Sequence, residues 1–186
     1  MEEDRHIKII EVDESIVLKE LEFSDAPVIF GAIENNRKFL AKWLPFVDYT
    51  CDLEDSQNFI KSVVDVPDED REYVFKILYQ KVFAGLIGFK GTDAINRKTE
   101  LGYWICESFQ GNGIVTKSVK ALMKFAFTDL FVNRIQIKCA TGNQKSKAIP
   151  IRLGFLFEGI ERDGERMNDG HYCDIEVYSF LKRQSL

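Results

Sequence analysis

The segment Glu100-Leu-Gly-Tyr-Trp-Ile-Cys-Glu-Ser-Phe-Gln-Gly-Asn-Gly-Ile-Val-Thr116 decides the fold. It predicts a β-strand over residues 99–105, a polar turn at Gln110–Thr116 and an amphipathic helix over residues 113–131. The two glycines beside Asn112 permit backbone angles at which successive N–H groups converge. Because the turn also opens a helix, where unpaired N–H groups and the helix dipole favour negative charge, it predicts a phosphate or pyrophosphate site.

A bare Gly-x-Gly also occurs in ordinary strand-to-helix loops. This turn lacks the third glycine and the acidic partner of the dinucleotide fingerprint, and it lacks the Gly-Lys-Ser/Thr of a P-loop. The chain beyond the helix strengthens the functional interpretation. A second strand is predicted over residues 134–140, Asn143-Gln-Lys-Ser146 opens another helix, and Leu153-Gly-Phe155 precedes Glu158-Gly159.

In this order, the Gln-Gly-x-Gly-Ile turn, the Asn-x-x-Ser and the Gly-Phe-x-x-Glu-Gly resemble the GNAT superfamily of acyl-CoA-dependent N-acetyltransferases. They are most similar to its RimJ/RimL-type branch, which acetylates the N-termini of ribosomal proteins. The resemblance covers about residues 16–181 and implies a single N-acetyltransferase domain over residues 1–186. The implied fold is α/β, of the α+β GNAT type. It has a twisted, mixed and mostly antiparallel sheet flanked by helices, in which strands 99–105 and 134–140 form a splayed parallel pair.

Length and composition agree with one globular domain, since 186 residues with 45% hydrophobic side chains suffice for a substantial core. No apolar run approaches the roughly 20 residues that span a bilayer, and the acidic residues Glu2, Glu3 and Asp4 do not resemble a secretory signal. We therefore expect a cytoplasmic protein without a membrane partner.

Cysteine and histidine usage points the same way. Four scattered cysteines without Cys-x-x-Cys spacing favour free thiols in a reducing compartment over two disulfides. His6 and His171 are the only histidines, too few for a histidine-based metal site, so no metal is expected.

The net charge of −5 is unevenly distributed. Residues 1–72 contain 19 acidic and 8 basic side chains, whereas residues 73–186 contain 11 acidic and 17 basic ones. A basic half suits an anionic cosubstrate and an acidic half suits a cationic acceptor, although solvated surface charge explains the same asymmetry. The acidic total disfavours nucleic acid as a direct partner.

Hydrophobic periodicity and turn residues predict the remaining elements. They are a hairpin or bent strand over residues 7–21, a helix capped by Ser24-Asp25 and reaching Ile33, a short helix over 36–46 stopped by Pro45, a helix over 55–64, an acidic loop over 65–72, a hairpin of strands 73–79 and 82–89 around Gln80-Lys81, a polar loop over 91–98, and two strands over 155–161 and 171–181 around a connection at 163–170.

The resemblance implies how acetyl-CoA binds. The pantetheine arm pairs with the strand edge at Tyr103, Trp104 and Ile105, as an added strand would. Asn143 and Ser146 also bind the cosubstrate, and the Ser146 hydroxyl approaches the sulfur. The pyrophosphate rests on the amides of the turn, formed by Gln110, Gly111, Asn112, Gly113, Ile114, Val115 and Thr116.

The resemblance also implies the chemistry. Glu165 is at the position of the carboxylate that activates the amine through water, and Glu100 is the competing base. Ser146 is the hydroxyl near the sulfur, although a helix N-cap explains its position equally well. A solvated loop glutamate is the corresponding alternative for Glu165. A buried Cys139 invites an acetyl-cysteine intermediate, but the family transfers the acetyl group directly.

Apolar residues at helical spacing, Phe39, Leu40, Trp43 and Leu44, are typical of core, whereas the resemblance implies that this stretch borders the acceptor groove. We expect Leu40 and Leu44 to be buried and Trp43 to line the groove in part. The expected acceptor is a protein N-terminal α-amine. The alternatives are a small amine, such as a polyamine or an aminoglycoside, and a non-catalytic CoA-binding module. Relatives of this kind are often homodimers.

Overall fold

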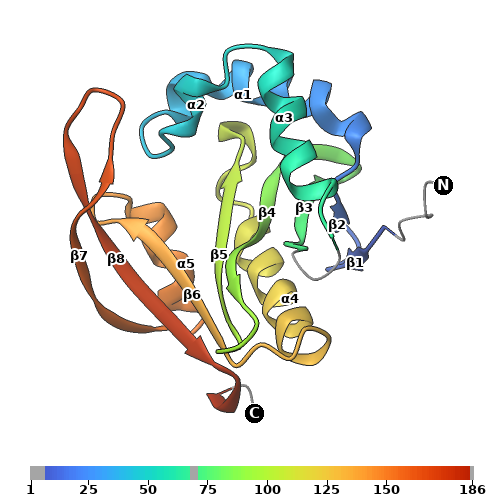
Figure 1. Cartoon of the computed structure of the whole chain (residues 1–186). Helices are drawn as coiled ribbons and strands as arrows, with labels where there is room; N and C mark the ends of the chain where they lie inside the picture. The colour runs from blue at the N-terminus through green and yellow to red at the C-terminus, as the bar shows by residue number, and fades with distance from the viewer. Residues whose placement is uncertain (1–6, 68–70, 185–186) are drawn as a thin grey trace.

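The computed structural model describes residues 7–67 and 71–184, which form one mixed sheet with helices on both faces (Figure 1). The strands are β1 (Ile9–Glu11), β2 (Ile16–Glu20), β3 (Val74–Tyr79), β4 (Val82–Asp93), β5 (Lys98–Ile105), β6 (Arg134–Ala140), β7 (Leu156–Arg166) and β8 (Tyr172–Leu181). The α-helices are α1 (Ala26–Leu40), α2 (Phe46–Tyr49), α3 (Leu53–Val64), α4 (Ile114–Thr128) and α5 (Gln144–Arg152).

The sheet order is β1-β2-β3-β4-β5-β6-β8-β7, and β5–β6 is its parallel pair. The ladder between these two strands has three residue pairs and ends at Glu100 and Gln136. Beyond that point β5 stays paired with β4 as far as Ile105, and β6 stays paired with β8 as far as Ala140. The two strands therefore diverge, as Figure 1 shows, and the predicted mixed sheet with a splayed parallel pair is confirmed.

Successive β5 residues face opposite sides of the sheet, because strand side chains alternate. Leu101 and Tyr103 belong to the core shared with α4 and α5, whereas Trp104 packs in the core beneath α1 and α3. The strand at the divergence therefore presents side chains to both helical layers.

Helix α4 confirms the predicted amphipathic helix, and its stripe of Val115, Val119, Leu122 and Ala126 is buried. It ends three residues before the predicted limit of residue 131. Phe131 adopts a left-handed backbone with φ of 54°, which takes the chain out of the helix.

The predicted division of the first helical region is wrong. We expected one helix ending near Ile33 and another over residues 36–46, but α1 runs unbroken to Leu40. Asn36 is tolerated inside the helix because its Nδ2 donates a hydrogen bond to the Ala32 carbonyl, at 2.8 Å. The predicted stop at Pro45 does not end a helix, because Pro45 is the N-cap of α2.

The predicted Ser24-Asp25 cap is right in position, because Asp25 is the N-cap residue of α1, but wrong in its bonding. Asp25 precedes α1 but makes no side-chain capping bond to it. Its carboxylate is buried, accepts the Glu22 N–H at 2.9 Å and pairs with the Lys76 ammonium. The Lys76 ammonium of β3 therefore binds the carboxylate of Asp25, which the sequence pattern predicted to cap α1.

Both predicted hairpins in the first half of the chain are present, and Gln80 and Lys81 turn the second with left-handed φ values of 49° and 68°. The strand ends differ from expectation. β4 continues to Asp93. β7 continues to Arg166 and so contains residues 163–166 of the predicted connection, because its pairing with β8 is interrupted after Glu161 but resumes at Glu165.

Some sequence features lie outside the described residues. They are the acidic residues 2–4, His6, and residues 68–70 of the acidic loop. Within residues 7–67 and 71–184, no helix is long and apolar enough to cross a membrane. The same residues contain no cluster of side chains arranged to hold a metal ion, and their four cysteines are free thiols.

An ion pair fastens the last two strands to β6. The Glu158 carboxylate of β7 accepts two hydrogen bonds from the Arg134 guanidinium of β6, each 2.6 Å long, and one from the Ser179 hydroxyl of β8. These hydrogen bonds, of which those from Arg134 have the larger effect, lower the pKa of Glu158 to about 2. A depressed carboxylate pKa stabilises the fold above the unfolded-state value, about 4.3, and this contribution is lost as pH falls toward 2.

We expect Glu158→Gln to lower the free energy of unfolding at pH 7 by no more than about 1 kcal/mol, because the pair is partly exposed and screened. The difference from the wild type should shrink below about pH 4 and vanish near pH 2, as measured by urea denaturation. The matched control is Glu14→Gln, an exposed carboxylate without a partner among the described residues. A pH-independent difference would contradict the assignment.

Candidate functional site

A cleft of about 1370 Å³ lies where β5 and β6 part. Its walls come from both sides of the sheet. On one side are the Gln110–Thr116 turn and α5; on the other are the α1–α2 turn and the inner surface of β7 and β8. The cleft can therefore admit two ligands from opposite faces.

The turn before α4 is built to receive an anion. Gly111 and Gly113 have φ values of 80° and 69°, and a Cβ at either position would meet no atom within 4 Å, so both face open space. Gly113 is the N-cap of α4 and supplies no side-chain acceptor. No described residue accepts a hydrogen bond from the amides of residues 114–116, so these donors remain for a ligand.

Two basic side chains from α5 border this turn. Arg152 Nη1 donates to Thr116 Oγ1 at 2.9 Å, and the Lys145 ammonium donates to Gln110 Oε1. Their partners are neutral, so both positive charges are available to an anion. Sequence reasoning missed both, because only the docking of α5 beside the turn brings them there.

The three lysines on the polar side of α4 differ in their surroundings. Lys117 lines the cleft and pairs with Asp13 at 2.8 Å, whereas Lys120 and Lys124 are exposed and lie outside it. Asn112, alone among the predicted turn residues, does not line the cleft. Its Nδ2 donates to the carbonyls of Phe109 and Gln110, which tightens the turn.

The predicted strand edge is present. Tyr103, Trp104 and Ile105 line the cleft on the part of β5 that has lost β6 as a partner. An unpaired edge offers alternating N–H and C=O groups, so it suits an extended, amide-containing ligand. The edge leads toward the amides of the turn, which suits a ligand with an anionic group at one end.

Asn143 and Ser146 lie at the start of α5, and the helix-cap alternative for Ser146 is wrong. Asn143 is the N-cap, and its Oδ1 accepts the Ser146 N–H at 3.1 Å. The Ser146 hydroxyl is therefore free of capping and lies 3.2 Å from the Tyr103 hydroxyl. Burial raises the pKa of Tyr103, so the phenol stays neutral and can donate a hydrogen bond.

Cys139 lies on β6 in the cleft wall and is nearly buried. Burial, together with the negative charge of Glu176, raises the pKa of its thiol to about 11. The thiol is thus almost wholly protonated at neutral pH, which makes it a poor nucleophile. This argues against an acetyl-cysteine intermediate.

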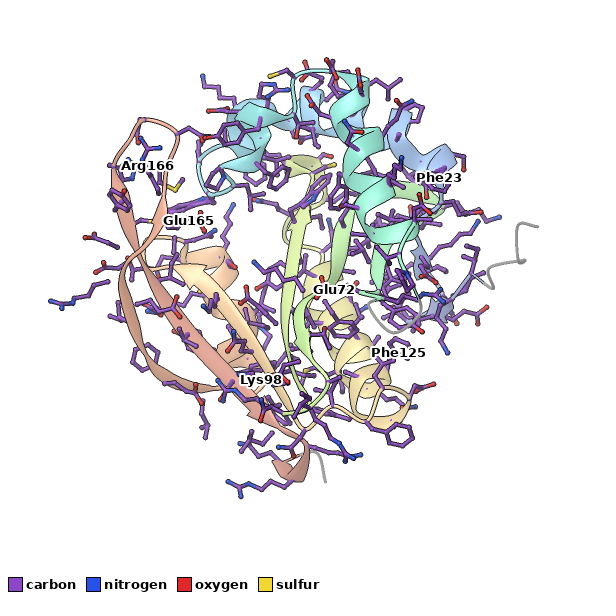
Figure 2. The ribbon with its side chains drawn as sticks, viewed as in Figure 1. Phe23, Glu72, Lys98, Phe125, Glu165 and Arg166 are labelled. Carbon is purple, nitrogen blue, oxygen red and sulfur yellow. The ribbon has the colours of Figure 1, made fainter. Side chains whose placement is uncertain are left out.

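The two candidate carboxylates have different surroundings. Glu100 Oε1 pairs with Lys90 Nζ at 2.8 Å, and Oε2 accepts a hydrogen bond from Gln136 Nε2 at 3.1 Å. Glu165 is exposed and lines the cleft, and its carboxylate makes no hydrogen bond or ion pair with any described residue. It comes from the part of β7 next to the hairpin turn, as Figure 2 shows.

The α1–α2 turn forms the opposite wall. Trp43 is 37% exposed and lines the cleft in part, as predicted, with its ring 3.1 Å from the position of a Cβ on Gly142. Leu40 is buried as expected, but Leu44 is only half-buried. Asn168 Nδ2 donates to the Pro45 carbonyl at 2.9 Å, so the β7–β8 turn meets this wall.

Comparison with known proteins agrees with this geometry. Residues 15–156 match the family model of the acetyltransferase (GNAT) domain. YdaF of Bacillus subtilis, provisionally named a ribosomal N-acetyltransferase, is 38% identical over 93% of this chain and 94% of its own. The ribosomal-protein-serine acetyltransferase of Escherichia coli is 28% identical over 91% of this chain and 94% of its own.

Solved structures have the same fold. RimL, a ribosomal L7/L12 alpha-N-protein acetyltransferase in complex with coenzyme A, is similar with a TM-score of 0.89 at 28% identity. The similarity covers 94% of this chain and 98% of RimL.

Proposed function

This chain belongs to the GNAT acetyltransferase family, and we propose that it transfers acetyl from acetyl-CoA to the N-terminal α-amine of a ribosomal protein. One arrangement carries the proposal. Unpaired helix amides, an unpaired strand edge and the unpaired carboxylate of Glu165 line a single cleft that is reached from both faces of the sheet.

The residues present fit acetyl-CoA. The amides of residues 114–116, with Lys145 and Arg152 beside them, are suited to a pyrophosphate. The β5 edge at residues 103–105 is suited to the amides of a pantetheine arm. Acetyl-CoA supplies an activated acyl group as a thioester, and the acceptor amine enters from the side of Trp43 and Glu165.

In the proposed reaction the amine nitrogen bonds to the acyl carbon and the carbon–sulfur bond breaks. Glu165 accepts the proton of the incoming ammonium through a water molecule, which leaves a neutral nucleophile. A backbone N–H of residues 103–105 stabilises the developing oxyanion, and the Ser146 hydroxyl donates a hydrogen bond to the departing sulfur. The nitrogen loses a second proton as the carbon–sulfur bond breaks, and that proton ends on the sulfur, so the products are the amide and the free CoA thiol. Each of these groups acts from the part of the cleft wall to which it belongs.

Glu165 is preferred over Glu100 as the base because of their contacts. Both oxygens of Glu100 are engaged, one by an ammonium and one by an amide, so accepting a proton would compete with both interactions. Glu165 has no such competitor among the described residues.

An α-amine suits this machinery. It titrates near 8, against about 10.4 for a lysine side chain, so a modest base suffices at neutral pH. The acidic excess of residues 1–72 would attract a basic polypeptide. Such an acceptor places the enzyme in the cytoplasm, where free thiols persist.

The proposal includes a homodimer. β7 is an edge strand on which Leu156, Phe157 and Ile160 are each more than half exposed. A second copy of the chain would cover this apolar edge. Sedimentation velocity that returned only the monomer mass of 21.5 kDa would rule this out.

We expect Gly113→Asp to weaken CoA binding at least tenfold in calorimetry. The substitution adds a negative charge beside the free amides and strains a left-handed backbone position. Gly91→Asp, at a left-handed glycine outside the cleft, is the matched control and should leave affinity unchanged. Full CoA affinity in a folded Gly113→Asp variant would contradict the pyrophosphate assignment.

Glu165→Gln should lower kcat by about 10²–10⁴-fold while CoA affinity survives, because only the proton acceptor is lost. The acidic limb of the pH–rate profile should disappear as well. Glu100→Gln is the comparison variant. If it is inactive and folded while Glu165→Gln keeps the wild-type rate, Glu100 is the base. Full activity in both would show that the enzyme acts by positioning an amine that arrives neutral.

Mass spectrometry of protein N-termini in a deletion strain tests the acceptor. We expect at least one ribosomal protein to lose its N-terminal acetyl group, and expression of wild-type enzyme, but not of Glu165→Gln, to restore it. Acetylation of spermidine without any ribosomal target would favour the small-amine alternative. CoA binding without turnover on any amine would favour a non-catalytic module.

A further inference from the structure

Pro150 lies inside α5, four residues after Ser146. In an α-helix the N–H of residue i+4 is donated to the carbonyl of residue i, so the Ser146 carbonyl would be bonded by residue 150. Proline has no N–H, and its ring also crowds the carbonyl four residues earlier. The Ser146 carbonyl therefore lacks the donor that a regular α-helix would give it.

The Tyr103 hydroxyl takes the place of that donor. It comes from β5 and donates to the Ser146 carbonyl at 3.3 Å. Burial raises the pKa of Tyr103, so its phenol is protonated at neutral pH and can donate this hydrogen bond. A side chain on the diverging strand thus completes the hydrogen bonding of a helix on the other half of the sheet.

The same phenol contacts the Ser146 hydroxyl, at 3.2 Å between the two oxygens. The phenol proton is within reach of both the carbonyl oxygen and the hydroxyl oxygen of Ser146 and is shared between them, so the serine keeps its own proton for the departing sulfur. Asn143 holds the Ser146 amide at the same time. The amide, carbonyl and hydroxyl of Ser146 are therefore each held by a partner in the cleft wall.

We propose that Tyr103 is a positioning residue that holds the Ser146 hydroxyl at the point where β5 and β6 part, through a carbonyl that Pro150 leaves open. The inference rests on the proposed acetyl transfer, in which Ser146 donates a hydrogen bond to the departing sulfur. Tyr103 acts through Ser146, and Pro150 is the reason that the tyrosine hydroxyl is needed.

A kinetic double-mutant cycle tests the coupling. We expect Tyr103→Phe to lower kcat by about tenfold to a hundredfold, with the KM for acetyl-CoA within about twofold of the wild type, because only positioning is lost. In a Ser146→Ala background the same change should alter kcat by less than about twofold. Tyr79→Phe, which removes a tyrosine hydroxyl outside the cleft, should keep the wild-type kcat.

Pro150→Ala supplies the missing N–H and gives a test by rescue. In that background the loss of kcat caused by Tyr103→Phe should become several-fold smaller. Additive losses for Tyr103→Phe and Ser146→Ala, or a Tyr103→Phe loss of equal size in the wild-type and Pro150→Ala backgrounds, would overturn the inference. If Tyr103→Phe alone does not fold, its comparison with wild type is made in the Pro150→Ala background, where folding should return; persistent unfolding there also overturns it.

The failure of the proposed function is separable from this result. A wild-type enzyme that turns over no amine would end the proposed function. The cycle is then measured on the urea midpoint of unfolding, where Tyr103→Phe should shift the midpoint less in the Pro150→Ala background than in the wild type. Equal shifts in the two backgrounds would overturn the link between Tyr103 and Pro150 whatever the reaction.

Discussion

The structure depends on the hydrogen-bonded pairing of β5 with β6, which ends after three residue pairs. β5 and β6 share three residue pairs, whereas β5 shares seven with β4 and β6 shares seven with β8. Each strand is thus held more firmly by its outer neighbour than by its parallel partner, and the sheet consists of two halves joined at one end. The cleft and the open strand edge are consequences of this imbalance.

The two mouths of the cleft have different electrostatic character. On the side of the α4 turn, the amides of residues 114–116 have no acceptor among the described residues. The cations of Lys145 and Arg152 beside them donate only to neutral side chains. On the other side, Lys90 and Lys138 are neutralised by Glu100 and Glu161, and the carboxylate of Glu165 has no partner within residues 7–67 and 71–184. An anionic ligand and a cationic one are therefore attracted to opposite faces and meet where the strands part.

The sequence predicted those features whose cause is local. The glycine turn and the stripe of α4 follow from periodicity or from residues within four positions of each other, whereas the divergence of β5 and β6 was implied by the resemblance to the GNAT superfamily. The sequence failed where a distant residue decided the outcome. Lys76 drew the Asp25 carboxylate away from α1, and an irregularity opposite β8 lengthened β7. The positions of Lys145 and Arg152 beside the turn also depend on how α5 docks, which no local pattern encodes.

Helix α5 shows why the fold and the site cannot be separated. A nine-residue helix with an internal proline has little stability of its own. Its position must therefore come from contacts with the sheet, and these contacts involve strands on both sides of the divergence. Tyr103 on β5 donates to the Ser146 carbonyl, and Glu176 on β8 pairs with Lys147 at 2.7 Å. Because these neighbouring residues contact strands on opposite sides of the divergence, α5 bridges the two halves of the sheet. The hydroxyl of Ser146 is consequently positioned by the same contacts that hold α5 across the gap.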